Sequence, residues 1–393
     1  MSTANRILRR MTAAGLLLIT VGATVSCTAA DRALIGAPQC SDADASPSRV
    51  QHDPGQAVLI GSVARSALPP GPIDGWERVI SVAHAGTAIA AVHPDGRVSV
   101  AGTEQDGILA GLAGPDGGLV EPRTVEGVTG AVSVAAVGST FLVTHRDGTL
   151  TAWGESFIAS GGEREDTREQ PTPQRVSDVD DVVSVAHGSM SALALRSDGS
   201  VRGWGINLTQ LLGEPDGTRV RTIRDVPGAV SIANAGGATV VASGAGEVCA
   251  LGNNVHGLLG VEPLGGQSPR VVRIEGLQRV EQVAGGHNFA LARDSAGGVW
   301  AWGRNDSGIS GEGDAADTAI AVPRRVPGLP PLRWIGAADF TAYGIDDDGG
   351  LWAWGGRLTH EPYVTDGPRP QRVPLPGPAQ YASGDVVLLE PTG

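Results

Sequence analysis

Short apolar runs recur along most of the chain, separated by clusters of turn-forming residues. The runs alternate or are rich in Ala, Val, Leu and Trp, a pattern typical of buried strands rather than helices. Many pairs of runs flank an Asp-Gly or Ala-Gly pair, whose glycine supplies the positive φ of a tight hairpin. The pattern therefore predicts an all-β chain built from hairpins.

A second glycine, six residues after the first, makes these hairpins a regular repeat. The first glycines of the six pairs are Gly96, Gly148, Gly199, Gly246, Gly297 and Gly349, at steps of 52, 51, 47, 51 and 52 residues. A fixed period near 50 is typical of propeller blades.

Each period holds four predicted strands. Examples of the first three are Val182–Val185, Ala192–Leu195 and Val299–Trp302. The fourth follows a proline, as in Pro173–Val176, and because proline is tolerated on edge strands we place it at the outer rim.

The chain ends supply the seventh blade. Residues 382–389 match the strands before an Asp-Gly turn, and the missing continuation stands near the start, in Gly55–Gly61. Sharing one blade between the termini leaves no open sheet edge. We therefore predict a seven-bladed β-propeller of four-stranded blades over residues 54–393, with the last blade closed by the N- and C-terminal strands together.

At these residues the repeats resemble those of the regulator of chromosome condensation family. Gly252–Gly260 resembles the family's Gly-x-Asn-x-x-Gly-x-Leu-Gly turn, and Gly205–Gly213 and Gly303–Gly308 follow it less fully. The resemblance covers about Gly55 to Gly393 and implies a seven-bladed propeller in a bacterial exported member, similar in closure to the family's secreted propeller inhibitor of β-lactamases. The family's usual histidine before the second strand is absent, where Ala88, Thr140, Ser191, Thr239 and Phe289 stand.

The first 26 residues have the charged-then-apolar pattern of a secretory signal. Arginines precede the apolar stretch Ala13–Val25, which is shorter than the about 20 residues of a membrane-spanning helix. Cys27 follows in a context that resembles a bacterial lipobox, so we expect lipid attachment there and a protein anchored to the cell membrane outside the cytoplasm. Cleavage near Ala30 with simple secretion is the alternative.

Residues 27–53 show no periodic apolar pattern, and we interpret them as a flexible tether. With Cys27 lipidated, Cys40 and Cys249 would remain in an oxidising compartment. Cys249 lies in a predicted buried strand and Cys40 in the tether, whereas a disulfide requires Cα atoms within about 7 Å. We therefore expect Cys249 to be a free core residue, with the disulfide as the alternative.

Charge limits the choice of partner. The net charge is −13, no lysine is present, and removal of residues 1–26 with their three arginines leaves −16. Nucleic-acid binding needs a basic footprint, so no nucleic-acid partner is expected. Export and the acidic charge also disfavour guanine-nucleotide exchange on a GTPase bound to chromatin, the activity that the resemblance would imply.

No catalytic motif, metal-ligand spacing or phosphate loop occurs in the sequence. His84, His187 and His287 fall at similar positions before the second strand, and an acid–base or metal cluster is one interpretation of them. The other is polar loop residues without a shared task, which we favour. We expect no catalytic residue, no metal and no cofactor.

The irregular parts of the repeat are the loops after each second glycine, which a propeller gathers on one face. Binding residues commonly lie on such loops over a rigid scaffold. The candidates for partner binding are Phe157, His256, Asp306, His360 and Tyr363. We expect a monomeric, non-catalytic binding scaffold that contacts an extracellular protein or cell-envelope component and reaches the membrane only through its lipid. An exported lyase or hydrolase with its site at one mouth of the central channel is the alternative.

Overall fold

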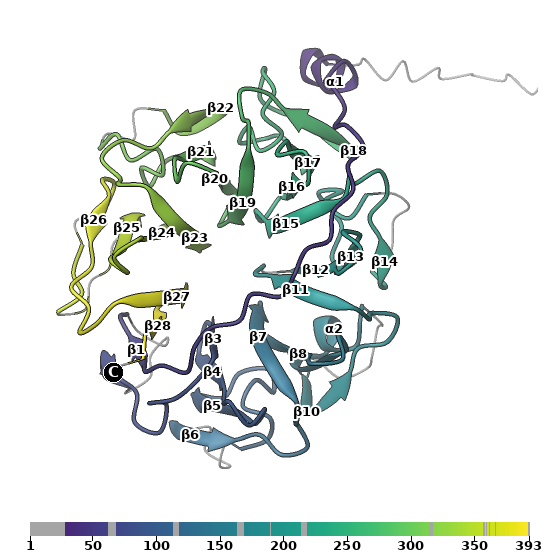
Figure 1. The fold of residues 1–393 in the computed structure, drawn as a ribbon. Coiled ribbons are helices and arrows are strands. Elements are labelled where there is room, and N and C mark those ends of the chain that lie inside the picture. Colours follow the sequence, from purple (N-terminus) through teal and green to yellow (C-terminus); the bar gives the residue numbers. More distant parts are fainter. Residues whose placement is uncertain are drawn as a thin grey trace, which may run out of the picture.

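The computed structural model describes residues 28–61, 68–112, 118–162, 169–188, 190–213, 218–313, 317–356, 358, 360, 362–365 and 367–391. Seven four-stranded antiparallel sheets stand around a central channel (Figure 1). The prediction of an all-β, seven-bladed propeller is confirmed. Two short helices, α1 (Ala29–Ile35) and α2 (Ser156–Ala159), were not predicted.

Each blade runs from an inner strand at the channel to an outer strand at the rim. Blade 1 holds β3 (Ser81–Ala85), β4 (Ala88–Val92), β5 (Val98–Gly102) and β6 (Val120–Thr124). Blade 2 holds β7 (Ala131–Val137), β8 (Thr140–His145), β9 (Leu150–Glu155) and β10 (Glu169–Arg175). Blade 3 holds β11 (Val182–Ala186), β12 (Ser191–Arg196), β13 (Val201–Gly205) and β14 (Arg221–Thr222).

The remaining blades follow the same order. Blade 4 holds β15 (Ala229–Asn234), β16 (Ala238–Ser243), β17 (Val248–Asn253) and β18 (Gln267–Ile274). Blade 5 holds β19 (Val280–Gly285), β20 (Phe289–Asp294), β21 (Val299–Arg304) and β22 (Ala319–Arg325). Blade 6 holds β23 (Leu332–Ala338), β24 (Thr341–Asp346), β25 (Leu351–Gly355) and β26 (Gln371–Arg372).

Blade 7 joins the two ends of the chain, as predicted. It holds β27 (Ala379–Ser383) and β28 (Val386–Leu389) from the C-terminus, and β1 (Ala57–Leu59) and β2 (Gly71–Pro72) from the N-terminus. β1 lies between β28 and β2, and Val58 pairs with Val387. All four β28 residues are buried, so the C-terminal strand contributes core as well as hydrogen bonds.

The strand order gives the propeller two different faces. The turn face carries the hairpin turns between second and third strands and the connections between blades. There each turn glycine has a positive φ, for example 83° at Gly96 and 78° at Gly199, as the hairpin prediction required. The loop face carries the loops that join the first to the second strand and the third to the fourth strand of each blade.

The Trp-Gly pair of the repeat connects neighbouring blades. Trp302 is buried, and its indole N–H donates to the carbonyl of Leu258, in the loop of the preceding blade, at 3.0 Å. Trp153, Trp204 and Trp354 make the equivalent bond to Ile108, Ile158 and Ile309 at 2.8 to 3.0 Å. The same side chain thus fills the core and satisfies a loop carbonyl.

The segment 28–53 differs from the flexible tether that the composition suggested. After α1, residues 37–54 form a strap that crosses the turn face from blade 4 to blade 7 (Figure 1). Backbone hydrogen bonds join Pro38 to Arg273 and Ala43 to Gly228, at 2.7 and 3.0 Å. Backbone pairing and side-chain contacts fix this segment, and neither leaves an apolar period in the sequence.

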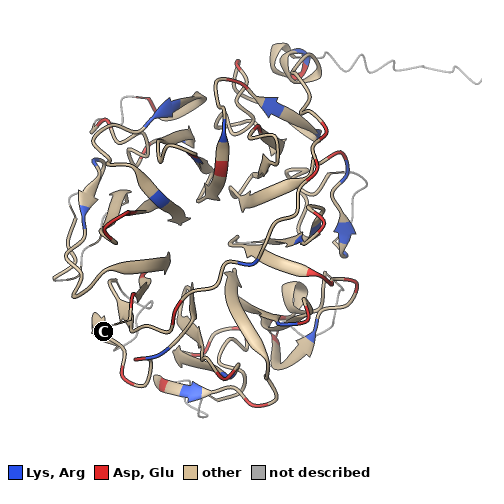
Figure 2. Cartoon of the chain, in the orientation of Figure 1, with Lys and Arg blue, Asp and Glu red and all other residues tan. Residues whose placement is uncertain are grey.

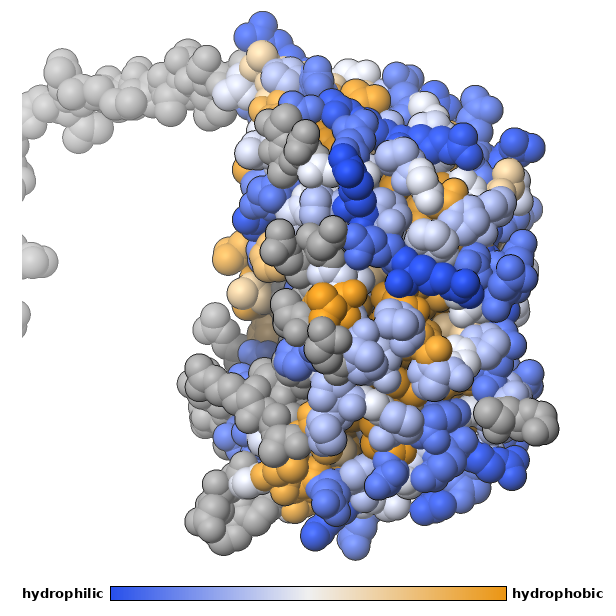
Figure 3. Space-filling view, turned by 90° about the vertical axis from the view of Figure 1, so that its left-hand side faces the viewer, coloured by the Kyte–Doolittle hydropathy of each residue, from blue (hydrophilic) through white to orange (hydrophobic). Residues whose placement is uncertain are grey.

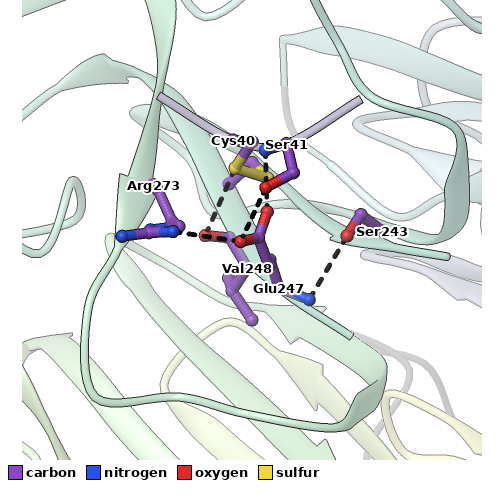
Figure 4. Close-up of a disulfide and its surroundings, with 7 residues drawn as sticks. Cys40, Ser41, Ser243, Glu247, Val248 and Arg273 are labelled. Carbon is purple, nitrogen blue, oxygen red and sulfur yellow. Dashed lines mark hydrogen bonds and ion pairs between the residues drawn. A yellow bond between two sulfur atoms is a disulfide. The ribbon is translucent and has the colours of Figure 1, made fainter. Parts of the chain in front are cut away.

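A disulfide joins the strap to blade 4, so the expectation of a free Cys249 is wrong. Cys40 and Cys249 have Cα atoms 6.2 Å apart and form the bridge. Figure 4 shows the neighbouring polar contacts: Glu247 accepts from the Ser41 backbone N–H at 2.8 Å and pairs with Arg273 at 3.1 Å. The Ser41 N–H, then Arg273, lowers the pKa of Glu247.

Helix α1 begins the described chain at the outer edge of blade 4. Thr28 and Asp31 form a capping box, and the buried side chains Ala30 and Leu34 face the propeller, Leu34 within the blade 4 core. Ile35 is 68% exposed. Within the described residues, no helix is long and apolar enough to span a bilayer.

Candidate functional site

Exposed apolar side chains gather on the loop face. Among the described residues, ten large hydrophobic side chains are exposed, and seven of them stand on loop-face loops. The seven are Leu119, Met190, Leu208, Val255, Leu264, Phe340 and Val364. In Figure 3, where the loop face forms the left edge, hydrophobic side chains protrude among its loops. These residues stand on loops of blades 1, 3, 4 and 6, so the loop face carries most of the large exposed apolar side chains of the described residues.

Two predicted candidates meet on this face. His256 lies on the β17–β18 loop and Asp306 on the β21–β22 loop, and each shifts the pKa of the other. Asp306 accepts from the Arg304 Nε at 2.8 Å, and this bond holds the pKa of Asp306 below its usual value. Burial and the charge of Arg304 lower the pKa of His256, so the imidazole is neutral at pH 7.

Phe340 adds an exposed aromatic ring to this pair. It lies on the β23–β24 loop and is 40% exposed. The Arg304 guanidinium carbon lies 5.2 Å from the centre of the ring, and the centre of the His287 imidazole lies 4.9 Å from it. Together, His256, His287, Arg304, Asp306 and Phe340 form a patch across blades 4 to 6, which we call the loop-face cluster.

The other three candidates stand on the loop face but do not join the cluster. Phe157 lies in α2 and is half-buried against the core shared by blades 2 and 3. His360 is half-buried on the β25–β26 loop. Tyr363 is only 4% exposed and packs in the core between blades 6 and 7, so its ring offers little surface to a partner. Cys27, the predicted lipid attachment site, lies outside the described residues.

Sequence reasoning missed Phe340, Met190 and Arg304. Phe340 and Met190 follow inner strands, in the short loops before the second strand, whereas the predicted candidates all stand on loops after the second glycine. Arg304 is the last residue of β21, where the repeat gives it no special status. An unusual apolar residue in those short loops was the available signal.

Two of the three histidines that share a repeat position do converge. At the loop-face end of the channel, the Ser383 hydroxyl lies 3.1 Å from His187 Nε2 and 3.3 Å from the backbone nitrogen of His84. Burial, with the nearby His84, lowers the pKa of His187 to about 4. Ser383 is 3% exposed. His287 belongs instead to the loop-face cluster.

Charge is spread around the ring. In Figure 2, blue segments lie mainly on the outermost strands of the blades, where the Pro-x-Arg signal of the repeat places its arginines. The arginines of the described residues are therefore spread around the rim in this view. Within the ranges that the structure describes, no group of three or more His, Cys, Asp or Glu side chains could hold a metal ion.

The repeat has recognisable relatives. The family model described as Regulator of chromosome condensation (RCC1) repeat matches residues 280–309, in blade 5. The human E3 ubiquitin-protein ligase HERC2 is 27% identical over 299 residues, which cover 70% of this chain and 6% of that protein. Protein pim1 of Schizosaccharomyces pombe is 25% identical over 347 residues, covering 76% of this chain and 62% of its own. The chain thus spans under two thirds of either relative.

Solved structures share the fold. Human WBSCR16 superposes with a TM-score of 0.72 at 21% identity, over 82% of this chain and 90% of that one. Yeast RCC1 (Prp20), solved with Kap60 bound, superposes with a TM-score of 0.69 at 18% identity, over 87% and 89% of the two chains. At these identities the likeness concerns the fold.

Proposed function

We propose that this seven-bladed propeller of RCC1 repeats is a binding scaffold that recognises a protein or cell-envelope component through its loop face. We further propose that it is exported and anchored by lipid at Cys27. In this proposal the propeller does no chemistry of its own. The loops of the loop face carry the contacts, and the ring of blades holds those loops in fixed positions.

The observation that carries the proposal is the one-sided distribution of exposed apolar side chains. Of the ten large exposed hydrophobic residues in the described ranges, only Ile35, Val50 and Val322 lie off the loop face. The loop-face cluster adds a charged pair and an exposed aromatic ring, and aromatic residues and arginine are both enriched in protein interfaces.

The disulfide supports the export part of the proposal. Structural disulfides form and persist in oxidising compartments and are rare in the cytosol. The Cys40–Cys249 bridge therefore agrees with the secretory signal expected in residues 1–26. Relatives supply only the class of partner: yeast RCC1 was solved with Kap60, and a second structure of it concerns its binding to Gsp1p and histones.

A pair of matched variants tests the proposal. Val255 on the loop face is 52% exposed and Val322 on the outer strand β22 is 55% exposed, so Val255→Asp and Val322→Asp make the same change in different places. Each tagged variant is incubated with culture medium and envelope extract, and the captured proteins are quantified. We expect the partner captured by the unmodified propeller to be lost with Val255→Asp and retained with Val322→Asp. Equal capture by both would refute loop-face recognition.

The contact of Ser383 with His187 favours a second candidate function, a hydrolase with its site at the channel mouth. A serine hydroxyl within hydrogen-bond distance of a neutral imidazole meets one geometric requirement of an activated nucleophile, and the burial-lowered pKa keeps His187 neutral. A fluorophosphonate probe tests this function. Labelling that Ser383→Ala and His187→Gln both abolish would support the hydrolase, and an unlabelled protein would leave binding as the function.

A further inference from the structure

The central channel encloses a cavity of about 450 Å³, within the range of pockets that hold small molecules. None of the residues of the loop-face cluster lines it, whereas Ser383 and His187 do. The inner strands of the seven blades form its wall, and strap residues Ser48 to Val50 and His52 close part of the turn-face side. A molecule in this cavity would contact the ring and the strap together.

The wall has two unlike halves. In blades 1 to 4, equivalent positions of the inner strands carry short serines, namely Ser81, Ser133, Ser184 and Ser231. In blades 5 to 7 the same positions carry Gln282, Trp334 and Tyr381. His52 of the strap stacks 5.0 Å from Tyr381, which in turn lies 5.3 Å from Trp334. One side of the cavity is therefore an aromatic wall.

The ionisable side chains that line the cavity carry excess positive charge. They include three arginines and a single carboxylate, Glu281, in a chain whose net charge is −13. Arg293 pairs with Glu281 at 2.9 Å, and Arg333 pairs at 2.8 Å with Glu390, which does not line the cavity. The Arg49 guanidinium donates to the carbonyls of Val182 and Arg146, at 2.8 and 3.4 Å.

Arg49 therefore forms no ion pair with any carboxylate of the described residues. Its Nε is buried and has no hydrogen-bond partner. Burial lowers the pKa of Arg49, and Asp147, too far away for an ion pair, raises it. Burial, then the positive charge of Arg333, lowers the pKa of His52 to about 4. The His52 imidazole is therefore neutral at pH 7 and adds no positive charge to the cavity.

We propose that the channel cavity binds a small organic anion, a carboxylate or phosphate attached to an aromatic ring. The anionic group pairs with Arg49 as a charge-assisted hydrogen bond, and the ring packs against Trp334 and Tyr381. Because the strap supplies Arg49 and His52, the site is complete only while the strap is docked. A free small molecule fits a cavity of this volume.

Ligand-observed NMR with the full disulfide-bonded propeller tests the site, using phenylacetate and phenyl phosphate as anionic probes. Phenylacetamide is the neutral control, since it keeps the ring and loses the charge. The variant Arg49→Gln removes the unpaired charge. Its matched control is Arg324→Gln, which removes an arginine on the outer strand β22 that pairs with Asp317 at 2.8 Å.

We expect at least one of the two anions to bind, and phenylacetamide to bind at least about tenfold more weakly. Arg49→Gln should lower the affinity for the anion about tenfold, whereas Arg324→Gln should leave that affinity unchanged. Quenching of tryptophan fluorescence that Trp334→Leu removes would support the aromatic contact. If Arg49→Gln does not fold, Arg49→Lys serves in its place, with reduced but measurable affinity expected. Absence of binding by both anions, equal binding of the amide, or an unchanged affinity in the Arg49 variant would overturn the proposal.

Discussion

Removal of the disulfide should destabilise the propeller by a large, measurable amount. Cys40 and Cys249 are 209 residues apart in sequence, so the bridge restricts more than half of the unfolded chain. The chain-entropy relation gives a stabilisation of about 5 kcal/mol for a loop of that length. Domains are stable by only about 5–15 kcal/mol in all, so the loss is a sizeable fraction of the total.

Cys40→Ser is the appropriate variant because Cys40 is only partly buried in the strap. Cys249 is fully buried in β17, where a serine hydroxyl would add its own desolvation cost. Denaturant unfolding of the wild type and of Cys40→Ser, followed by tryptophan fluorescence, measures the difference. Adding a reductant provides the control: the reduced wild type should match Cys40→Ser, and the variant should not respond.

Hydrogen exchange should also show faster exchange at the amides of Arg273 and Gly228, which donate to strap carbonyls. An identical unfolding midpoint for the oxidised and reduced wild type would refute the reasoning. It would mean that the bridge adds nothing to the stability of the propeller.

Four further predictions concern other parts of the chain. Deletion of residues 382–393 should expose sheet edges in blade 7 and cause unfolding or aggregation, and a monomer with an unchanged melting curve would contradict it. Cys27→Ala should move the protein from the membrane fraction to the medium, which an unmodified mature N-terminus near residue 31 would contradict. Trp302→Phe should cost about 2 kcal/mol by leaving a buried carbonyl unpaired, whereas Trp300→Phe, at a half-buried position, should cost less. Because the folded-state pKa of His52, about 4, lies below its unfolded value, stability should fall as pH drops from about 6.5 toward 4, and His52→Gln should lessen that loss by about 2 kcal/mol at pH 5.

The regular part of the fold could be predicted because turn chemistry and hydrophobic pattern repeat. The glycine spacing fixed six hairpins, and Gly55–Gly61 with residues 382–389 indicated the shared blade that the structure contains. The hairpins of each blade are specified by residues that are close together in the sequence. Local sequence and global fold agree at these positions.

The strap could not be predicted because its contacts are specific to this chain and distant in sequence. Cys40 pairs with a residue 209 positions away, and nothing in the composition of residues 27–53 signals a docked conformation. The loop-face cluster could be predicted only in part for the same reason. His256 and Asp306 were identified from their loops. Their proximity to Arg304 and Phe340 depends on how adjacent blades pack, which the sequence does not show. Exposure, which separates Phe340 from the buried Tyr363, is not readable from residue type.

The most direct test of the loop-face proposal is site-specific photocrosslinking in cells that express the protein. A benzoylphenylalanine replaces Phe340 on the loop face in one variant and Val322 on the outer rim in another, two exposed apolar positions of the same chain. We predict a discrete covalent adduct with one partner from position 340 and none from position 322. Adducts of equal yield from both positions, or an adduct from position 322 alone, would contradict recognition through the loop face.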